Sequence, residues 1–303
     1  MNAMASAQMD RRTFLKKTMQ TTAAVALASL KGRKSLPIPA WFELTTWDVT
    51  VPGLGKAFEG YRLLHLTDIH QSEWMSTSKL TALKDFVLGS GVDVVVITGD
   101  STYHTTNYQP LLDFYTGLAA QTPVLMTWGN HDIWDDAATG LQPILSNNVR
   151  LLSNERWLIE RAGDRLCIAG LGCAYEELDD LASVIDEFPK DTPAIMLAHE
   201  PDVADAVAET GKFFLQLSGH SHGGQICLPN GYAPILPWLG QRYPRGYYDV
   251  NGMMLYTSRG LGRGKPFIRT YCPGEAEIFT LRCGDRPSFE PTQNDSTMKE
   301  ESL

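Results

Sequence analysis

Five short apolar runs, rich in β-branched residues, each stop directly at a block of Asp, Asn, His and Gly residues. The run from Val92 to Thr98, for example, leads into Gly99-Asp100. Runs of this length are typical of buried strands. Stretches with helical spacing lie between several of them, so the alternation predicts an α/β domain whose strands end in polar loops. The five blocks are Asp68-Ile69-His70, Gly99-Asp100, Gly129-Asn130-His131-Asp132, His199 and Gly219-His220-Ser221-His222.

The patterns predict both element types at defined positions. Strands are predicted at 61–67, 92–98, 123–128, 165–171, 194–198, 213–218, 253–258 and 276–281. Helices are predicted at 78–88, 108–119, 137–146, 177–188 and 203–209. The sequence contains no internal repeat or low-complexity segment.

Length and composition are those of one large domain with tails. A chain of 303 residues with 43% hydrophobic and 20% charged residues has enough apolar material for a core. We expect a catalytic domain over residues 41–284, preceded by a signal and linker at 1–40. A polar, proline-containing tail at 285–303 is expected to be loosely attached. The net charge of −9 argues against nucleic acid as a partner, because phosphate backbones recruit clustered Lys and Arg.

The N-terminus resembles a twin-arginine export signal. Arg11-Arg12 precede a Phe-Leu step, and a mildly apolar run follows from Thr21 to Leu30. This run is far shorter than the ~20 residues that span a bilayer. We therefore expect export to the periplasm or cell envelope, with peripheral membrane or cell-wall association. A basic tail without a targeting role stays open as the alternative.

The cysteines lack the spacing of a metal site or a disulfide framework. Five are present, widely separated along the chain. We expect them to be mostly buried small apolar side chains, with one disulfide left open as an alternative.

The five blocks are expected to meet at one site. Ligands bind outside the carboxyl ends of strands in open α/β sheets, and each block follows such an end. Of the 7 histidines in the chain, His70, His131, His199, His220 and His222 lie in these blocks. The glycines before Asp100, Asn130 and His220 suit tight turns with close backbone approach.

The donor types indicate divalent metal ions. Carboxylate, amide and imidazole donors without thiolate fit Mn, Fe or Zn and disfavour a structural cysteine-type zinc site. The donors Asp68, His70, Asp100, Asn130, His199, His220 and His222 are more than one tetrahedral ion needs. A carboxylate such as Asp100 can bridge two ions ~3.5 to 4 Å apart, so two ions are predicted.

The ordered set of blocks resembles the signature of calcineurin-like metallophosphoesterases. The resemblance implies a two-sheet β-sandwich flanked by helices. It also implies that Asp68, His70 and His222 hold one ion and that Asn130, His199 and His220 hold the other, with Asp100 bridging. A hydroxide bridging the ions would attack phosphorus, and His131 would assist the leaving group. Asp132 would support His131, with a helix-capping role as the alternative.

Two further segments, around Gly219 and from Tyr256 to Gly262, resemble a bacterial subfamily. It includes UDP-2,3-diacylglucosamine hydrolases, which act on a lipid A precursor, and cell-wall-associated phosphodiesterases. The expected substrate is a phosphorylated small molecule or glycolipid, cleaved at a phosphodiester or pyrophosphate. A noncatalytic, metal-containing envelope-binding protein and a hydrolase of another bond type are the alternatives.

Other residues receive weaker assignments. Arg259 in a glycine-rich loop is a candidate substrate-binding residue, with a solvated surface loop as the alternative. The aromatic segment from Tyr232 to Tyr248 is either a compact packed loop or a lid that faces acyl chains or a membrane. His65 and His104 are expected to be structural, since they lie outside the five blocks.

Overall fold

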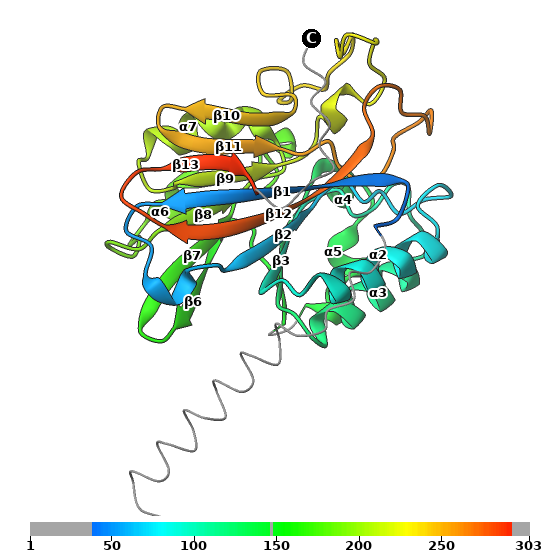
Figure 1. Ribbon diagram of the computed structural model, residues 1–303. Coiled ribbons are helices and arrows are strands. Elements are labelled where there is room, and N and C mark those ends of the chain that lie inside the picture. The colour runs from blue at the N-terminus through cyan, green and yellow to red at the C-terminus, as the bar shows by residue number, and fades with distance from the viewer. Residues whose placement is uncertain (1–37, 146–147, 293–303) are drawn as a thin grey trace, which may run out of the picture. The chain divides into compact units, whose positions relative to one another are not determined.

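The computed structural model describes residues 38–145 and 148–292, and within them the strands form two sheets (Figure 1). The seven-stranded sheet has the order β13-β1-β12-β2-β3-β4-β5, and the six-stranded sheet has the order β10-β11-β9-β8-β7-β6. The first contains β1 (Phe42–Val51), β2 (Arg62–Leu66), β3 (Val94–Thr98), β4 (Val124–Thr127), β5 (Val149–Leu151), β12 (Gly274–Cys283) and β13 (Ser288–Pro291). The second contains β6 (Glu155–Arg161), β7 (Asp164–Gly170), β8 (Ala194–Leu197), β9 (Leu215–Ser218), β10 (Gly246–Val250) and β11 (Met253–Thr257).

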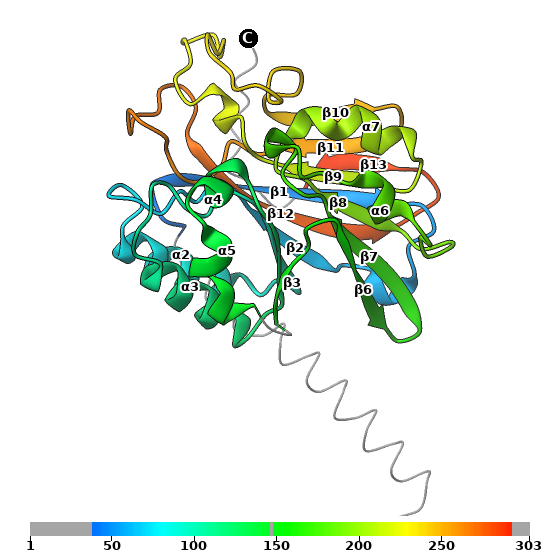
Figure 2. The same ribbon diagram turned by 180° about the vertical axis from the view of Figure 1, so that it is seen from behind.

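Helices cover the outer face of each sheet. Figures 1 and 2 show α2 and α3 on one side of the sandwich and α6 and α7 on the other. The helices are α2 (Thr77–Ser90), α3 (Gln109–Ala119), α4 (Asn130–Trp134), α5 (Ala137–Gly140), α6 (Leu181–Ile185) and α7 (Ala204–Glu209). Short 3-10 turns lie at Lys56–Phe58, Gln142–Ile144, Ala174–Glu176, Pro201–Val203 and His222–Gly224. No helix among the described residues is both long and apolar enough to cross a bilayer. The expected two-sheet α/β sandwich is confirmed.

Apolar side chains fill three layers. Between the sheets, Leu63 and Val96 pack with Ile195 and Leu217. The second layer joins α2 and α3 to the seven-stranded sheet, and the third joins α6 and α7 to the six-stranded sheet. Every residue of β3 is buried because both of its faces are covered, which explains its unbroken apolar sequence.

Parallel pairing brings the polar blocks to one edge. Strands β2, β3 and β4 run parallel to one another, as do β8, β9 and β11 in the other sheet. The carboxyl ends of neighbouring parallel strands lie at the same edge of a sheet. The loops that follow these strands therefore share one end of the sandwich.

The predicted strands are all present, within a few residues of the expected bounds. The strands β1, β5, β6, β10 and β13 were not predicted, since their sequences mix polar with apolar residues and lack a continuous apolar run. The helices expected at 137–146 and 177–188 are shorter than predicted and are replaced in part by turns.

The C-terminal tail begins later than expected. Loose attachment from residue 285 is wrong for Ser288–Pro291, which pair antiparallel with β1 as β13. Phe289 stacks on Tyr247 at 4.5 Å between ring centroids, and this packing stabilises the strand on the sheet. The signal expected at 1–40 falls almost wholly outside the described residues, as does the chain after residue 292.

The cysteines match expectation. All five are unbonded thiols, and all except Cys283 are buried.

A buried pair of one histidine and one glutamate lies between the sheets. His65 of β2 is the cross-strand partner of Glu277 of β12, and their side chains approach to 2.9 Å. Both side chains are fully buried. Burial lowers the pKa of His65 to about 3, and burial together with Glu275 raises the pKa of Glu277 well above its ordinary value. With these two pKa shifts both side chains are neutral, and Glu277 keeps its proton. The other ring nitrogen of His65 bonds to the Thr98 hydroxyl, so the structural role expected for this histidine is confirmed.

The Glu277 proton makes stability depend on pH. Above pH 6.5 the unfolded chain has ionised Glu277 and His65 is neutral in both states, while the folded protein keeps the Glu277 proton. Stability therefore falls as pH rises towards the folded pKa of Glu277. We expect the free energy of unfolding of wild type to fall relative to Glu277→Gln between about pH 6.5 and 8.5, by at most ~1.4 kcal/mol per pH unit. Urea unfolding at a series of pH values measures this. Parallel profiles for the two proteins would contradict the neutral pair.

Candidate metal centre

The loops that carry the polar blocks meet across the two sheets. The Asp68 N–H donates to the Gly99 carbonyl at 3.1 Å, and the Gly219 N–H donates to the His199 carbonyl at 3.0 Å. A further bond, from the His220 N–H to the Asp68 carboxylate at 3.0 Å, links one sheet to the other. The expected convergence of the five blocks is therefore present.

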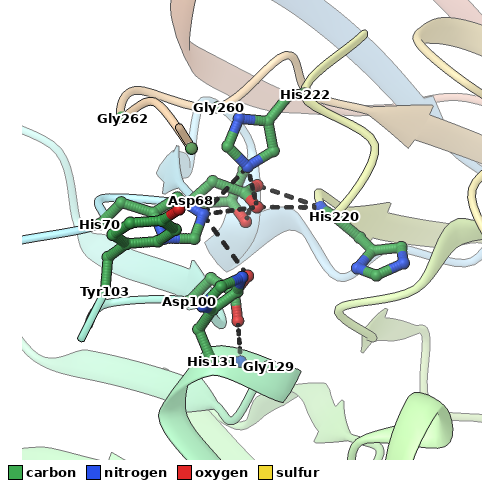
Figure 3. Close-up of polar contacts among 12 residues, drawn as sticks. Asp68, His70, Asp100, Tyr103, Gly129, His131, His220, His222, Gly260 and Gly262 are labelled. Carbon is green, nitrogen blue, oxygen red and sulfur yellow. Dashed lines mark hydrogen bonds and ion pairs between the residues drawn. The ribbon is translucent and has the colours of Figure 1, made fainter. Parts of the chain in front are cut away.

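One group of donor atoms surrounds the Asp68 carboxylate (Figure 3). The Nε2 atom of His222 lies 3.2 Å from Asp68 Oδ1, and that of His70 lies 3.8 Å from the same oxygen. The two Nε2 atoms lie 2.9 Å apart. Figure 3 shows these three side chains pointing toward one another from the ends of two different sheets.

A second group shares the Asp100 carboxylate. Its Oδ2 atom lies 3.3 Å from His199 Nε2 and 3.5 Å from His70 Nε2. His220 Nδ1 lies 3.2 Å from His199 Nε2. Asn130 is buried, and its Oδ1 atom has no hydrogen-bond partner. Asp100 thus stands between the two groups of donors.

Backbone carbonyls fix the orientation of three imidazoles. His70 Nδ1 contacts the Thr102 carbonyl at 3.1 Å, His199 Nδ1 the Thr98 carbonyl at 2.7 Å, and His220 Nε2 the Trp238 carbonyl at 2.8 Å. A carbonyl can only accept, so each of these nitrogens carries the proton. The opposite nitrogen of each ring then presents a lone pair to the centre, which is the arrangement of a metal-bound histidine.

The donor set fits divalent cations. Lone pairs and carboxylates that face one another at about 3 to 4 Å repel unless positive charge lies among them. Burial lowers the pKa of His70 to about 3, which keeps its ring in the neutral, ligating form. Burial opposes charge on His199, but Asp100 and Asp68 outweigh it and raise its pKa. The site therefore attracts positive charge at the position where an ion would bind.

The backbone at this centre is strained. Asp68, His70, Asp100, His220 and His222 all have φ between 48° and 67°, in the left-handed region. Residues with a side chain avoid this region, at a cost of order 1 to 3 kcal/mol each. Such strain persists only where the surrounding structure enforces it, and it clusters at functional sites.

Two glycines allow the loops to approach closely. A Cβ atom on Gly219 would lie 2.1 Å from Thr67 Oγ1, and one on Gly129 would lie 2.2 Å from Asp100 Oδ1. These contacts explain the glycines that precede His220 and Asn130 in the sequence.

His131 lies beside both donor groups. Its backbone N–H donates to Asp100 at 2.9 Å, and its ring stacks on Tyr103 at 4.9 Å between centroids. One of its ring nitrogens lies close enough to His70 and Asp100 to complete a third group of donor atoms. Burial is the main cause that lowers its pKa, with Asp100 opposing. Its position suits either a catalytic group or a ligand.

The Asp132 carboxylate accepts hydrogen bonds from backbone N–H groups rather than from the His131 ring. Its carboxylate accepts from the Ser101 and Thr102 N–H groups at 2.9 and 3.1 Å and from the Gly129 N–H at 3.1 Å. The last bond caps the start of α4, so the capping alternative describes its contacts. The expected support of the His131 ring is not observed, because these backbone donors occupy both carboxylate oxygens. Burial, followed by the nearby Asp100, raises the pKa of Asp132 to about 7.

Arg259 is paired with two carboxylates. Its guanidinium binds Glu275 and Glu43, each at 2.9 Å. These ion pairs tie the loop after β11 to β12 and β1, while the substrate-binding role expected for Arg259 stays a prediction. His104 contacts no carboxylate of the centre in the described residues, but its ring lies 6.2 Å from that of His131.

A second arginine, Arg269, binds the loops at the site, and it was not singled out from the sequence. Its guanidinium donates to the backbone carbonyls of Arg259 at 2.7 Å, Gly262 at 2.7 Å and His222 at 3.2 Å. Gly262 in turn donates to the Asp68 carbonyl at 2.6 Å. Arg269 thus connects the loops that carry His222 and Asp68. No local pattern marks it, because its partners are backbone carbonyls, which carry no side-chain signal in the sequence.

Comparison with known proteins identifies the class of the site. Residues 61–224, just over half of the chain, match the family model described as calcineurin-like phosphoesterase. The chain belongs to this family, and it is a metal-dependent phosphoester hydrolase. The expected family is confirmed.

Two bacterial relatives align over nearly their whole length. The metallophosphoesterase YkuE of Bacillus subtilis is 28% identical and covers 91% of this chain and 98% of its own length. The phosphodiesterase YaeI of Escherichia coli is 26% identical and covers 90% of this chain and 99% of its own. Among solved structures, TT1561 of Thermus thermophilus covers 66% of this chain and 90% of its own with a TM-score of 0.45 at 15% identity. That likeness is too low to carry an argument.

Arg269 is expected to control metal affinity. Arg269→Met leaves several buried carbonyls without a donor and loosens the loops that carry His222 and Asp68. Loss of such support for ligands typically weakens metal binding by about 10- to 100-fold. Titration calorimetry with Mn²⁺ measures the change. Arg263→Met is the control, because this arginine donates to the Phe267 carbonyl instead. Equal affinities of both variants and wild type would contradict the role of Arg269.

Proposed function

We propose that the chain hydrolyses phosphodiesters with two divalent metal ions. The observation that carries this proposal is the shared carboxylate, since His70 and His199 both approach Asp100 Oδ2, at 3.5 and 3.3 Å. Asp68, His70 and His222 would hold one ion and Asn130, His199 and His220 would hold the other, with Asp100 shared by the two groups of donors. Mn, Fe and Zn suit this mixture of carboxylate, amide and imidazole.

When bound, two such ions would supply positive charge that acidifies a water molecule and neutralises phosphoryl oxygens. The residues of the chain fix where that charge would lie. Asp68 and Asp100 provide the carboxylates, and the carbonyls of Thr98, Thr102 and Trp238 hold the rings in the ligating tautomer. Such fixed electrostatics are usually the largest contribution to catalysis.

His131 assists the leaving group. Its ring borders both donor groups, and its lowered pKa keeps it neutral with one N–H to offer to the departing oxygen. This position between the ions and the rim of the site favours a catalytic role over metal binding.

The substrate class follows from the relatives and from the expected location. YaeI, which aligns with almost the whole chain, carries the name phosphodiesterase. An exported enzyme meets envelope phosphodiesters, whereas UDP-linked lipid A precursors are cytosolic. We therefore favour an envelope phosphodiester over a pyrophosphate of the UDP-2,3-diacylglucosamine type.

His131→Ala separates the catalytic role from metal binding. We expect the variant to bind two equivalents of Mn²⁺ and to lose about 10²- to 10⁴-fold in kcat on bis-p-nitrophenyl phosphate, the range typical of a lost general acid. Metal analysis and turnover are measured on the same preparation. His104→Ala is the control, because its ring lies close to His131 but outside the donor groups. Loss of a metal equivalent would make His131 a ligand, and unchanged turnover would remove it from catalysis.

Export is proposed from Arg11 and Arg12, which lie outside the described residues. A twin-arginine route carries the folded enzyme with its metal ions in place. We expect Arg11→Lys combined with Arg12→Lys to keep the protein in the cytosol, while wild type is found in the envelope fraction. Fractionation followed by immunoblotting measures this. Wild type confined to the cytosol would refute export.

A further inference from the structure

We propose that Trp134, Tyr175 and Trp238 form a platform that binds a sugar ring on one alcohol of the phosphodiester. The inference rests on the proposed function and specifies its substrate. The three side chains are called the aromatic platform below. They come from three separate segments, namely α4, the 3-10 turn Ala174–Glu176 and the loop before β10.

The platform runs along one side of the metal centre. The Trp134 ring lies 4.7 Å from the His131 ring between centroids, at one end of the platform. Tyr175 is next, 5.7 Å from Trp134 and 5.6 Å from Trp238. Tyr175 also lies 5.7 Å from the ring of His220. A group bound here would therefore sit beside the phosphoryl centre and close to His131.

The metal-binding segments hold the platform in place. The backbone N–H of Tyr175 donates at 3.0 Å to Glu200, a buried carboxylate that directly follows His199 in the sequence. The Trp238 carbonyl accepts from His220 at 2.8 Å. Trp134 belongs to α4, the helix that also carries Asn130 and His131. The platform is thus preorganised by the same residues that position the ligands.

The platform is open to solvent. Trp134 is 51% exposed and Trp238 is 55% exposed, which is unusual for tryptophan beside a catalytic centre. Large exposed aromatic surface next to a catalytic group points to a binding surface rather than to core packing.

The polar groups beside the platform favour a neutral, hydroxyl-bearing ring. Glu176 accepts from the Trp134 indole N–H at 2.8 Å. Asp135 lies next to Trp134 in the sequence and is half-buried, and its Oδ2 atom accepts from the Thr105 N–H at 3.0 Å. Carboxylates accept hydrogen bonds from sugar hydroxyls, and they repel a group that carries further phosphates. Aromatic faces contact the apolar face of a ring at the same time.

An acyl chain is the competing occupant. The loop before Trp238 exposes Ile235, at 80%, and Tyr232, at 60%. A lid for acyl chains would use these apolar side chains as much as the platform. Ile235 is not part of the platform, so Ile235→Ala separates the two occupants and serves as the matched control.

The test compares methyl phosphodiesters whose second alcohol is ethanol, n-octanol or glucose linked through its O6 atom. Steady-state kinetics with Mn²⁺ gives kcat/KM for each. We expect wild type to prefer the glucose diester to the ethyl diester. Trp134→Ala and Trp238→Ala should each lower this glucose-to-ethyl ratio by about three- to tenfold, the range that aromatic contacts supply. Trp134→Phe, which keeps a ring, should retain most of the ratio, and Ile235→Ala should leave it unchanged.

The outcomes separate this inference from the proposed function. If no diester is hydrolysed, the proposed function fails. If the ethyl diester is hydrolysed and the tryptophan variants keep the wild-type ratio, the platform fails while the function stands. A preference for the octyl diester that is lost in Ile235→Ala would assign the surface to an acyl chain and overturn the sugar. Thermal unfolding of each variant shows whether a changed ratio comes from a folded protein.

Discussion

The mutual repulsion of carboxylates and imidazole lone pairs at the end of the sandwich is the constraint on which the site depends. The Nε2 atoms of His70 and His222 lie 2.9 Å apart beside the Asp68 carboxylate, and Asp100 lies close to both His70 and His199. In an unfolded chain these groups would be solvated and far apart. In the folded chain, backbone carbonyls fix the rings, and several donor residues adopt left-handed backbone angles. The packing of the two sheets compensates for this strain and keeps together a group of donors that favours cations.

Side chains outside the donor set sustain this geometry. Asp132 gathers three backbone N–H groups from two loops, and Arg269 gathers carbonyls from two others. Both are satisfied by the backbone, which holds their loops in place because moving them would leave polar groups without partners. Arg259 and Glu275 do the same for the loop after β11. The functional loops are thus held by electrostatics at one end and by strand pairing at the other.

The aromatic residues beside the metal centre differ from its donor residues in solvent exposure. The donor side chains lie at the end of the sandwich and are mostly buried, whereas Trp134 and Trp238 are exposed. Metal chemistry can serve many phosphate esters, so we expect a choice among alcohols to be made at the exposed aromatic residues. The direct links from His220 to Trp238 and from Glu200 to Tyr175 couple the two parts, because the same segments position both.

The sequence by itself determined the fold class, the strand ends and the candidate donor residues, because apolar runs and the side chains that follow them are local features. It also excluded His65, whose position within a strand predicted burial. Only the tertiary structure decided the roles of Arg259, Asp132 and Arg269. Each of these depends on partners tens to hundreds of residues away, such as Glu43 for Arg259. Polar strands such as β1 and β13 likewise form because neighbouring strands offer hydrogen bonds, which no local pattern records.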